Sequence, residues 1–91
     1  MQHKNTKKSQ LIFKLLSDEI KQARTSQNKS LRVLADEFDI QRSLLSRIEN
    51  GINEPKIISI WTICESLGIK PSELFSRIEQ KLPDDFTLLD D

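Results

Sequence analysis

The stretch that decides the fold lies at residues 30–55 and has the sequence SLRVLADEFDIQRSLLSRIENGINEP. Ser30 is placed to cap a first short helix, because a serine hydroxyl accepts a hydrogen bond from the free backbone amides at a helix start. A second short helix is expected at residues 41–50. Gly51 ends it, since glycine adopts the left-handed conformation without steric cost. The segment therefore predicts two short helices joined by a tight turn.

This spacing is typical of a helix-turn-helix. The small residue Ala35 stands where the two helices must pass close to each other. Asp39 belongs to the residue types that tolerate a positive φ in the turn, and Ile40 follows it as the buried turn residue. Leu45 and Ile48 fall on one face of the second helix. The opposite, polar face is therefore free to enter a DNA major groove.

Three further helices are expected, at residues 9–26 with Ser9 as the N-cap, at residues 57–67, and at residues 72–80. No segment alternates convincingly with the period of a strand, so an all-α, five-helix domain is predicted. The side chains expected to face the core are Leu11, Ile12, Leu15, Leu16, Ile20, Ala23, Leu31, Leu34, Ala35, Phe38, Leu45, Ile48, Ile57, Ile60, Trp61, Cys64, Leu67, Leu74, Phe75 and Ile78.

Length and composition limit the chain to one small domain. Its 91 residues support a single modest core, and 36% of them are hydrophobic and 31% charged. No run approaches the roughly 20 apolar residues of a membrane span, and the basic start lacks the small-residue cleavage site of a signal peptide. The single cysteine, Cys64, fits a reducing cytoplasm. We expect a basic disordered arm at residues 1–8, the domain at 9–80 and an acidic tail at 81–91.

The formal net charge of zero hides an asymmetry. Residues 1–56 hold 11 lysines and arginines and 7 acidic residues, whereas residues 57–91 hold 3 and 7. The first part therefore carries +4 and the second −4. Such a division between two parts of a chain favours a nucleic-acid surface on the basic part.

The segment at 30–55 resembles the DNA-binding domain of the phage repressor and Cro type, the Xre family. The resemblance covers roughly residues 16–76 and implies a lambda-repressor-like domain in a dimeric transcriptional regulator of a bacterium or phage. The residues that carry it are Ser30, Leu34, Ala35, Ile40, Ser46, Ile48, Glu49, Gly51 and Pro55.

The resemblance also implies roles for single residues. It pairs Arg24 with Glu49, which gives both a structural role. Leu44 is expected to meet a thymine methyl group or to cover the neighbouring core. The positions that contact bases in the family are Arg42, Ser43, Leu44 and Arg47. Those that contact phosphates are Gln41, Ser46, Asn50 and Lys56.

Dimer contacts must come from within the domain, and we expect them at Ile58, Phe75 and Ile78, on the last two helices. The apolar residues of the tail, Phe86, Leu88 and Leu89, suit two uses. They can dock on the extended start of the first helix, or they can form a short motif for another protein. Both uses stay open at this point.

No enzyme, cofactor or metal site is expected. The chain has one cysteine, one histidine and two glycines, so it lacks a zinc-ligand spacing and a glycine-rich phosphate loop. The pattern favours a regulator that binds double-stranded DNA as a homodimer and acts as a repressor of its own gene or as a controller in a restriction–modification locus. The alternatives are a DNA-binding antitoxin, and a protein-interaction adaptor that has lost DNA binding.

Overall fold

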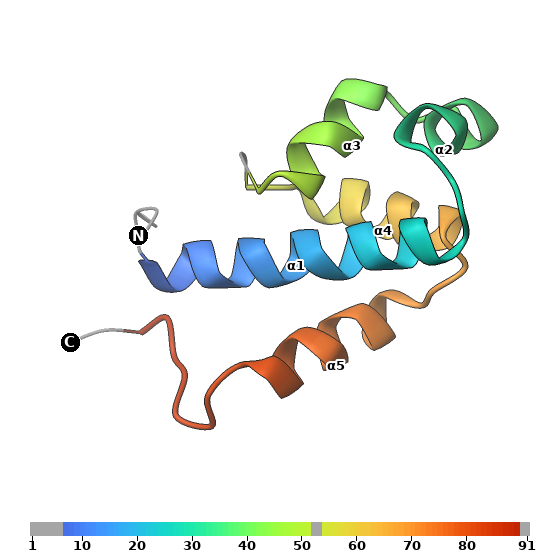
Figure 1. Ribbon diagram of the computed structural model, residues 1–91. Helices are drawn as coiled ribbons and strands as arrows, with labels where there is room; N and C mark the ends of the chain where they lie inside the picture. The colour runs from blue at the N-terminus through green and yellow to red at the C-terminus, as the bar shows by residue number, and fades with distance from the viewer. Residues whose placement is uncertain (1–6, 52–53, 90–91) are drawn as a thin grey trace.

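The computed structural model of the chain describes residues 7–51 and 54–89. In these two ranges all regular secondary structure is helical, as the sequence predicts (Figure 1). The five helices are α1 (Lys7–Ser26), α2 (Leu31–Phe38), α3 (Arg42–Glu49), α4 (Ile57–Ser66) and α5 (Pro71–Lys81). The predicted all-α, five-helix fold is therefore confirmed.

The first helix begins earlier than the sequence pattern predicts. α1 starts at Lys7, so Ser9 lies inside the helix and the prediction that it is the N-cap is wrong. Lysine is a good helix former, and Lys7 and Lys8 already belong to the helix before Ser9. Lys7 and Lys8 consequently belong to α1 rather than to an arm, whereas the rest of the expected arm, residues 1–6, lies outside the described residues.

The turn between α2 and α3 has the predicted chemistry. The Ser30 side chain caps α2 by accepting a hydrogen bond of 3.1 Å from the backbone N of Val33. Asp39 ends the helix in the left-handed region, with φ 54°. The amide of Ile40 then donates to the carbonyl of Ala35 over 2.9 Å. These contacts fix the direction in which α3 leaves the turn.

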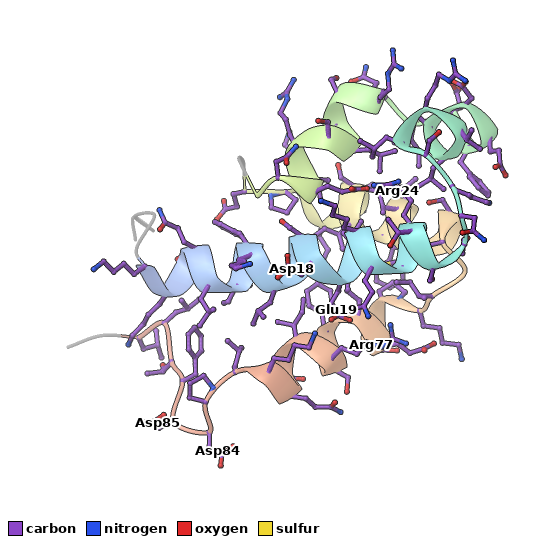
Figure 2. The ribbon with its side chains drawn as sticks, in the orientation of Figure 1. Asp18, Glu19, Arg24, Arg77, Asp84 and Asp85 are labelled. Carbon is purple, nitrogen blue, oxygen red and sulfur yellow. The ribbon has the colours of Figure 1, made fainter. Side chains whose placement is uncertain are left out.

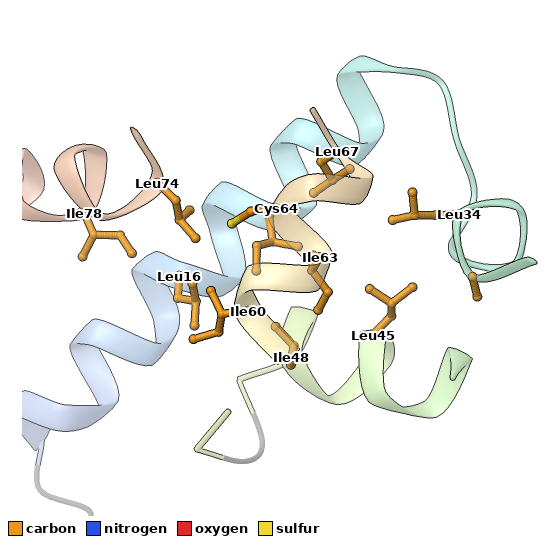
Figure 3. Packing of buried hydrophobic residues seen from close by; sticks show 12 residues of the cluster. Leu16, Leu34, Leu45, Ile48, Ile60, Ile63, Cys64, Leu67, Leu74 and Ile78 are labelled. Carbon is orange, nitrogen blue, oxygen red and sulfur yellow. The ribbon is translucent and has the colours of Figure 1, made fainter. Parts of the chain in front are cut away.

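The core forms around the long helix α1, which packs against α3 on one side and α5 on the other (Figure 1). α2 packs on α3, and α4 packs on α5. Figure 3 shows apolar side chains from all these helices meeting between them. The buried residues of this cluster are Leu16, Ile20, Leu34, Ala35, Leu45, Ile48, Ile60, Ile63, Cys64, Leu67, Leu74 and Ile78.

Five side chains that were expected in the core are exposed instead: Leu11, Phe38, Ile57, Trp61 and Phe75. Trp61 is 50% exposed and Ile57 more so, because α4 is apolar on nearly all sides and its neighbours cover only the side of Ile60 and Cys64. Phe38 is also exposed, at the end of α2. Its ring lies 5.5 Å from the ammonium of Lys29, which is a cation–π distance.

A buried carboxylate joins α1 to α5, which the helical pattern did not predict. The Glu19 side chain on α1 is only 5% exposed and forms an ion pair with Lys81, while Arg77 lies 3.9 Å away. Figure 2 shows Glu19 and Arg77 between the two helices. After α5, Leu82 packs against the core, whereas Leu88 and Leu89 are exposed.

Candidate nucleic-acid interface

The short helix α3 has two faces of opposite chemistry. Leu45 and Ile48 are buried in the core. On the other side Arg42, Ser43 and Arg47 are exposed, and they form what we call the recognition face. Two exposed arginines and a hydroxyl on one side of a helix are suited to bonding with base edges and phosphates.

Leu44 and Ser46 are half-buried rather than exposed. Leu44 packs against the edge of the core, as its covering role requires, and its side chain stays partly exposed. Of the residues expected at phosphates, Gln41 and Lys56 are exposed at the starts of α3 and α4.

Asn50 caps the end of α3. Its side-chain amide nitrogen donates to the carbonyl of Ser46 over 2.7 Å and lies 3.4 Å from the Ser46 hydroxyl. Its backbone amide donates to the same carbonyl over 3.0 Å. The side chain is thus already engaged with its own helix, so a phosphate contact from Asn50 has to share that amide group or use the Ser46 hydroxyl beside it.

The structure brings Arg24 and Glu49 together in a bidentate ion pair between α1 and α3. The Arg24 Nε and Nη2 donate to the two carboxylate oxygens over 2.7 Å and 2.9 Å. The two side chains are 11% and 4% exposed, and Nη1 also donates to the Lys29 carbonyl over 2.6 Å. Figure 2 shows Arg24 on the side of α1 that faces α3.

The hydrogen bond with Glu49 raises the pKa of the Arg24 guanidinium above its ordinary value, against the opposing effect of burial. Arg24 therefore stays charged, and the Glu49 carboxylate adds no free negative charge to the end of α3. The positive charges of Arg42 and Arg47 are left exposed on the recognition face.

Ser17 is a second contact between α1 and α3 that the sequence analysis missed. It is 5% exposed, and its Oγ lies 2.6 Å from the carbonyl oxygen of Ile48. A polar residue next to Leu16 on the apolar side of α1 was the available signal, but the periodicity did not show which helix it would face.

The residues that the sequence predicts at a dimer interface differ in their exposure. Ile58 is 72% exposed and Phe75 is 36% exposed, but Ile78 is 3% exposed because it packs in the core between α5 and α1. The prediction that Ile78 is available to a partner is therefore wrong. The exposed apolar residues of these helices, which we call the α4–α5 face, are Ile57, Ile58, Trp61 and Phe75.

Potential metal ligands, the single cysteine and the length of the helices give no second candidate site in the described residues. These residues contain no group of three or more histidine, cysteine or acidic side chains that could hold a metal ion. Burial raises the pKa of the Cys64 thiol, so the thiol stays neutral and packs as an apolar side chain. No helix in this part of the chain is long and apolar enough to cross a membrane.

Comparison of the sequence with known families places the chain in one of them. The helix-turn-helix family matches residues 20–74, and the chain belongs to it, in the Xre-type group of DNA-binding regulators. Members of this family are DNA-binding regulators of transcription that bind double-stranded DNA and are not enzymes.

One relative is the control protein C.MunI of Mycoplasma sp., which is 40% identical over 47 residues. That match covers 52% of this chain and 64% of the relative's length. No solved structure matches the chain.

Proposed function

We propose that the chain binds an operator as a homodimer, with α3 of each copy in the major groove of one half-site. The observation that carries this proposal is the recognition face, on which Arg42 and Arg47 are exposed while the opposite side of the same helix is buried. Arginine pairs bidentately with guanine O6 and N7 in the major groove, so these two side chains are the base-reading groups. Ser43 and the open part of Leu44 add contacts to a base edge and a thymine methyl group.

Phosphate contacts flank the bases in this proposal. Gln41 and Lys56 are exposed at the starts of two successive helices, α3 and α4. Ser46 and Asn50 lie at the other end of α3, joined to each other by hydrogen bonds. Contacts of this kind set the position and orientation of the helix on the DNA but carry no sequence information.

The α4–α5 face supports dimerisation. Removal of the exposed isoleucine and tryptophan side chains from water on association is favourable. The four residues of this face carry no charge that would have to be desolvated. A single domain of this size buries little DNA surface, whereas two copies occupy two half-sites about one helical turn apart. We therefore assign the second copy of the chain to this face, with Ile57, Ile58, Trp61 and Phe75 as the candidate contacts.

Likeness to a control protein favours a role in controlling gene expression, including that of the chain's own gene. The exposed Leu88 and Leu89 of the tail favour a second candidate contact, with another protein, as in an antitoxin. Both roles use the same recognition face.

Selection of bound duplexes from random DNA tests the proposal. We expect an inverted repeat whose half-sites have centres about 10 base pairs apart. A single unrepeated site would contradict the homodimer, and recovery of no preferred sequence would contradict operator binding and favour the adaptor. Co-purification of a stable protein partner from the native host would favour the antitoxin.

A further inference from the structure

The C-terminal end of α3 is held from α1 at two points. One is the Arg24–Glu49 ion pair, which joins side chain to side chain. The other is Ser17, whose hydroxyl contacts the backbone of α3 at Ile48, 31 residues further along the chain. A hydroxyl has a single hydrogen, and of its two short contacts the 2.6 Å contact with Ile48 is shorter than the 2.7 Å contact with Phe13 in its own helix.

Gly51 shows how closely the two segments approach at this point. It has a φ of 63°, and a Cβ added to it would lie 3.3 Å from the Ser17 Oγ, which is tighter than nearly all real Cβ contacts. The Gly51 amide also donates to the Ile48 carbonyl over 3.1 Å. The Ile48 carbonyl therefore accepts hydrogen bonds from the Gly51 amide and from the Ser17 hydroxyl of α1. The hydrogen bond from Ser17 holds the backbone at the point where α3 ends.

The position of this backbone matters for reading DNA. Arg47 precedes Ile48 directly, and Asn50 follows two residues later. α3 has eight residues and is only about 12 Å long, so a small shift of its last turn moves the Arg47 side chain relative to a base pair. A displacement of this kind weakens base contacts, which need good geometry, more than contacts with phosphates.

We infer that Ser17 is a positioning residue for sequence recognition, which holds the last turn of α3 in the orientation from which Arg47 reads bases. This inference rests on the proposed function of α3. Ser17 itself is buried beneath the helix, so it acts through Ile48 rather than by touching DNA.

Ser66 offers a matched control. It is also a buried serine inside a helix, and its hydroxyl donates to a backbone carbonyl over 2.7 Å. The acceptor, Ile63, belongs to the same helix, α4, so this hydrogen bond does not connect one helix to another. Ser17→Ala and Ser66→Ala thus make the same chemical change, but only the first removes a contact with α3.

The test measures the affinity of each full-length variant for the selected operator duplex and for a scrambled duplex of equal length. Both variants should fold, because alanine favours helix and the Ile48 carbonyl keeps the Gly51 amide. We expect Ser17→Ala to lose about fivefold to tenfold in operator affinity, the worth of one hydrogen bond, and to bind scrambled DNA unchanged. Ser66→Ala should match the wild type on both duplexes.

Hydrogen exchange of the Asn50 and Gly51 amides supplies a second measurement. It should accelerate in Ser17→Ala relative to Ser66→Ala at matched global stability, because the turn that holds these amides has lost its tie to α1. Equal operator affinity, or equal exchange, in the two variants would overturn the inference. A wild-type protein that binds both duplexes equally would instead contradict the proposed function.

Discussion

Two exposed surfaces of this small domain differ in nearly every chemical respect. The recognition face on α3 presents two arginines and a serine, with Gln41 and Lys56 beside it. The α4–α5 face presents isoleucine, tryptophan and phenylalanine side chains that the core does not cover. One surface suits a charged partner with many hydrogen-bond acceptors, and the other suits a dry protein contact.

The supports behind the two surfaces differ as well. α3 is tied to α1 by polar contacts, the Arg24–Glu49 pair and the Ser17 hydroxyl, besides its apolar packing. Behind the exposed residues of α4 the buried side chains Ile60 and Cys64 are apolar, and the polar tie to α1 on this side of the molecule, the Glu19–Lys81 ion pair, belongs to α5. We infer that the direction of α3 depends on specific hydrogen bonds close to the recognition face, whereas the apolar residues of α4 are positioned mainly by packing. Four substitutions test this contrast, from the largest expected effect to the smallest.

Glu49→Ala should have the largest effect. It leaves the guanidinium of Arg24 buried without its carboxylate partner, and breaking a buried pair in this way costs about 3–5 kcal/mol. Urea denaturation followed by circular dichroism measures the loss. Asp18→Ala is the control, because that exposed carboxylate pairs with Lys14 on the surface of α1 over 3.1 Å, and its removal should cost under about 0.5 kcal/mol. Similar losses in the two variants would show that the ion pair does not support α3.

Ile58→Asp should dissociate the dimer. A carboxylate at the centre of an apolar contact must be desolvated without a partner, so we expect the dimer dissociation constant to rise by about a hundredfold or more. Sedimentation equilibrium measures it. Leu89→Asp makes a matching change at an exposed position of the tail and should leave the dimer intact. A dimer that survives Ile58→Asp would rule out the α4–α5 face as its interface.

Arg47→Ala should cost about 1–3 kcal/mol on the selected operator and much less on scrambled DNA, because it removes a base contact. Fluorescence anisotropy on both duplexes measures the difference. Arg77→Ala, which removes an exposed arginine from α5, should bind both duplexes like the wild type. An equal loss on both duplexes for Arg47→Ala would assign that side chain to phosphate instead.

Lys56→Ala should have the smallest effect. A lost phosphate contact weakens binding to every sequence by a similar factor and reduces the slope of log affinity against log salt by about 0.9 for each copy, or about 1.8 for the dimer. A salt series on the operator and on scrambled DNA measures it. Lys70→Ala is the control, since Lys70 is the equivalent N-cap residue of α5. If the two lysine variants have the same salt slope, Lys56 does not contact phosphate.

Much of this architecture could be predicted from the sequence, because its signals are local. Ser30, Asp39 and Gly51 act through the backbone of their own turns, so the helix-turn-helix and its boundaries follow from residue type and spacing. The polar face of α3 follows from helical periodicity in the same way.

Residues that depend on how helices cross could not be placed. α4 is apolar on most of its circumference, so periodicity could not show that Ile60 would be buried and Trp61 exposed. The burial of Ile78 and the pairing of Glu19 with Lys81 both depend on where α5 lies against α1. These three-dimensional contacts explain why the predicted dimer patch needed correction. The position of the candidate DNA-binding helix depends on local signals and needed none.

The central claim is that the exposed face of α3 contacts the bases of each half-site, while the two copies of the chain are joined through the α4–α5 face. The most direct measurement is to repeat the selection from random DNA with Arg42→Ala and to compare the selected site with that of the wild type. We predict that a base preference disappears at one symmetrically related position in each half-site, while the spacing of the half-sites is unchanged. An unaltered site, or a changed spacing, would contradict the account.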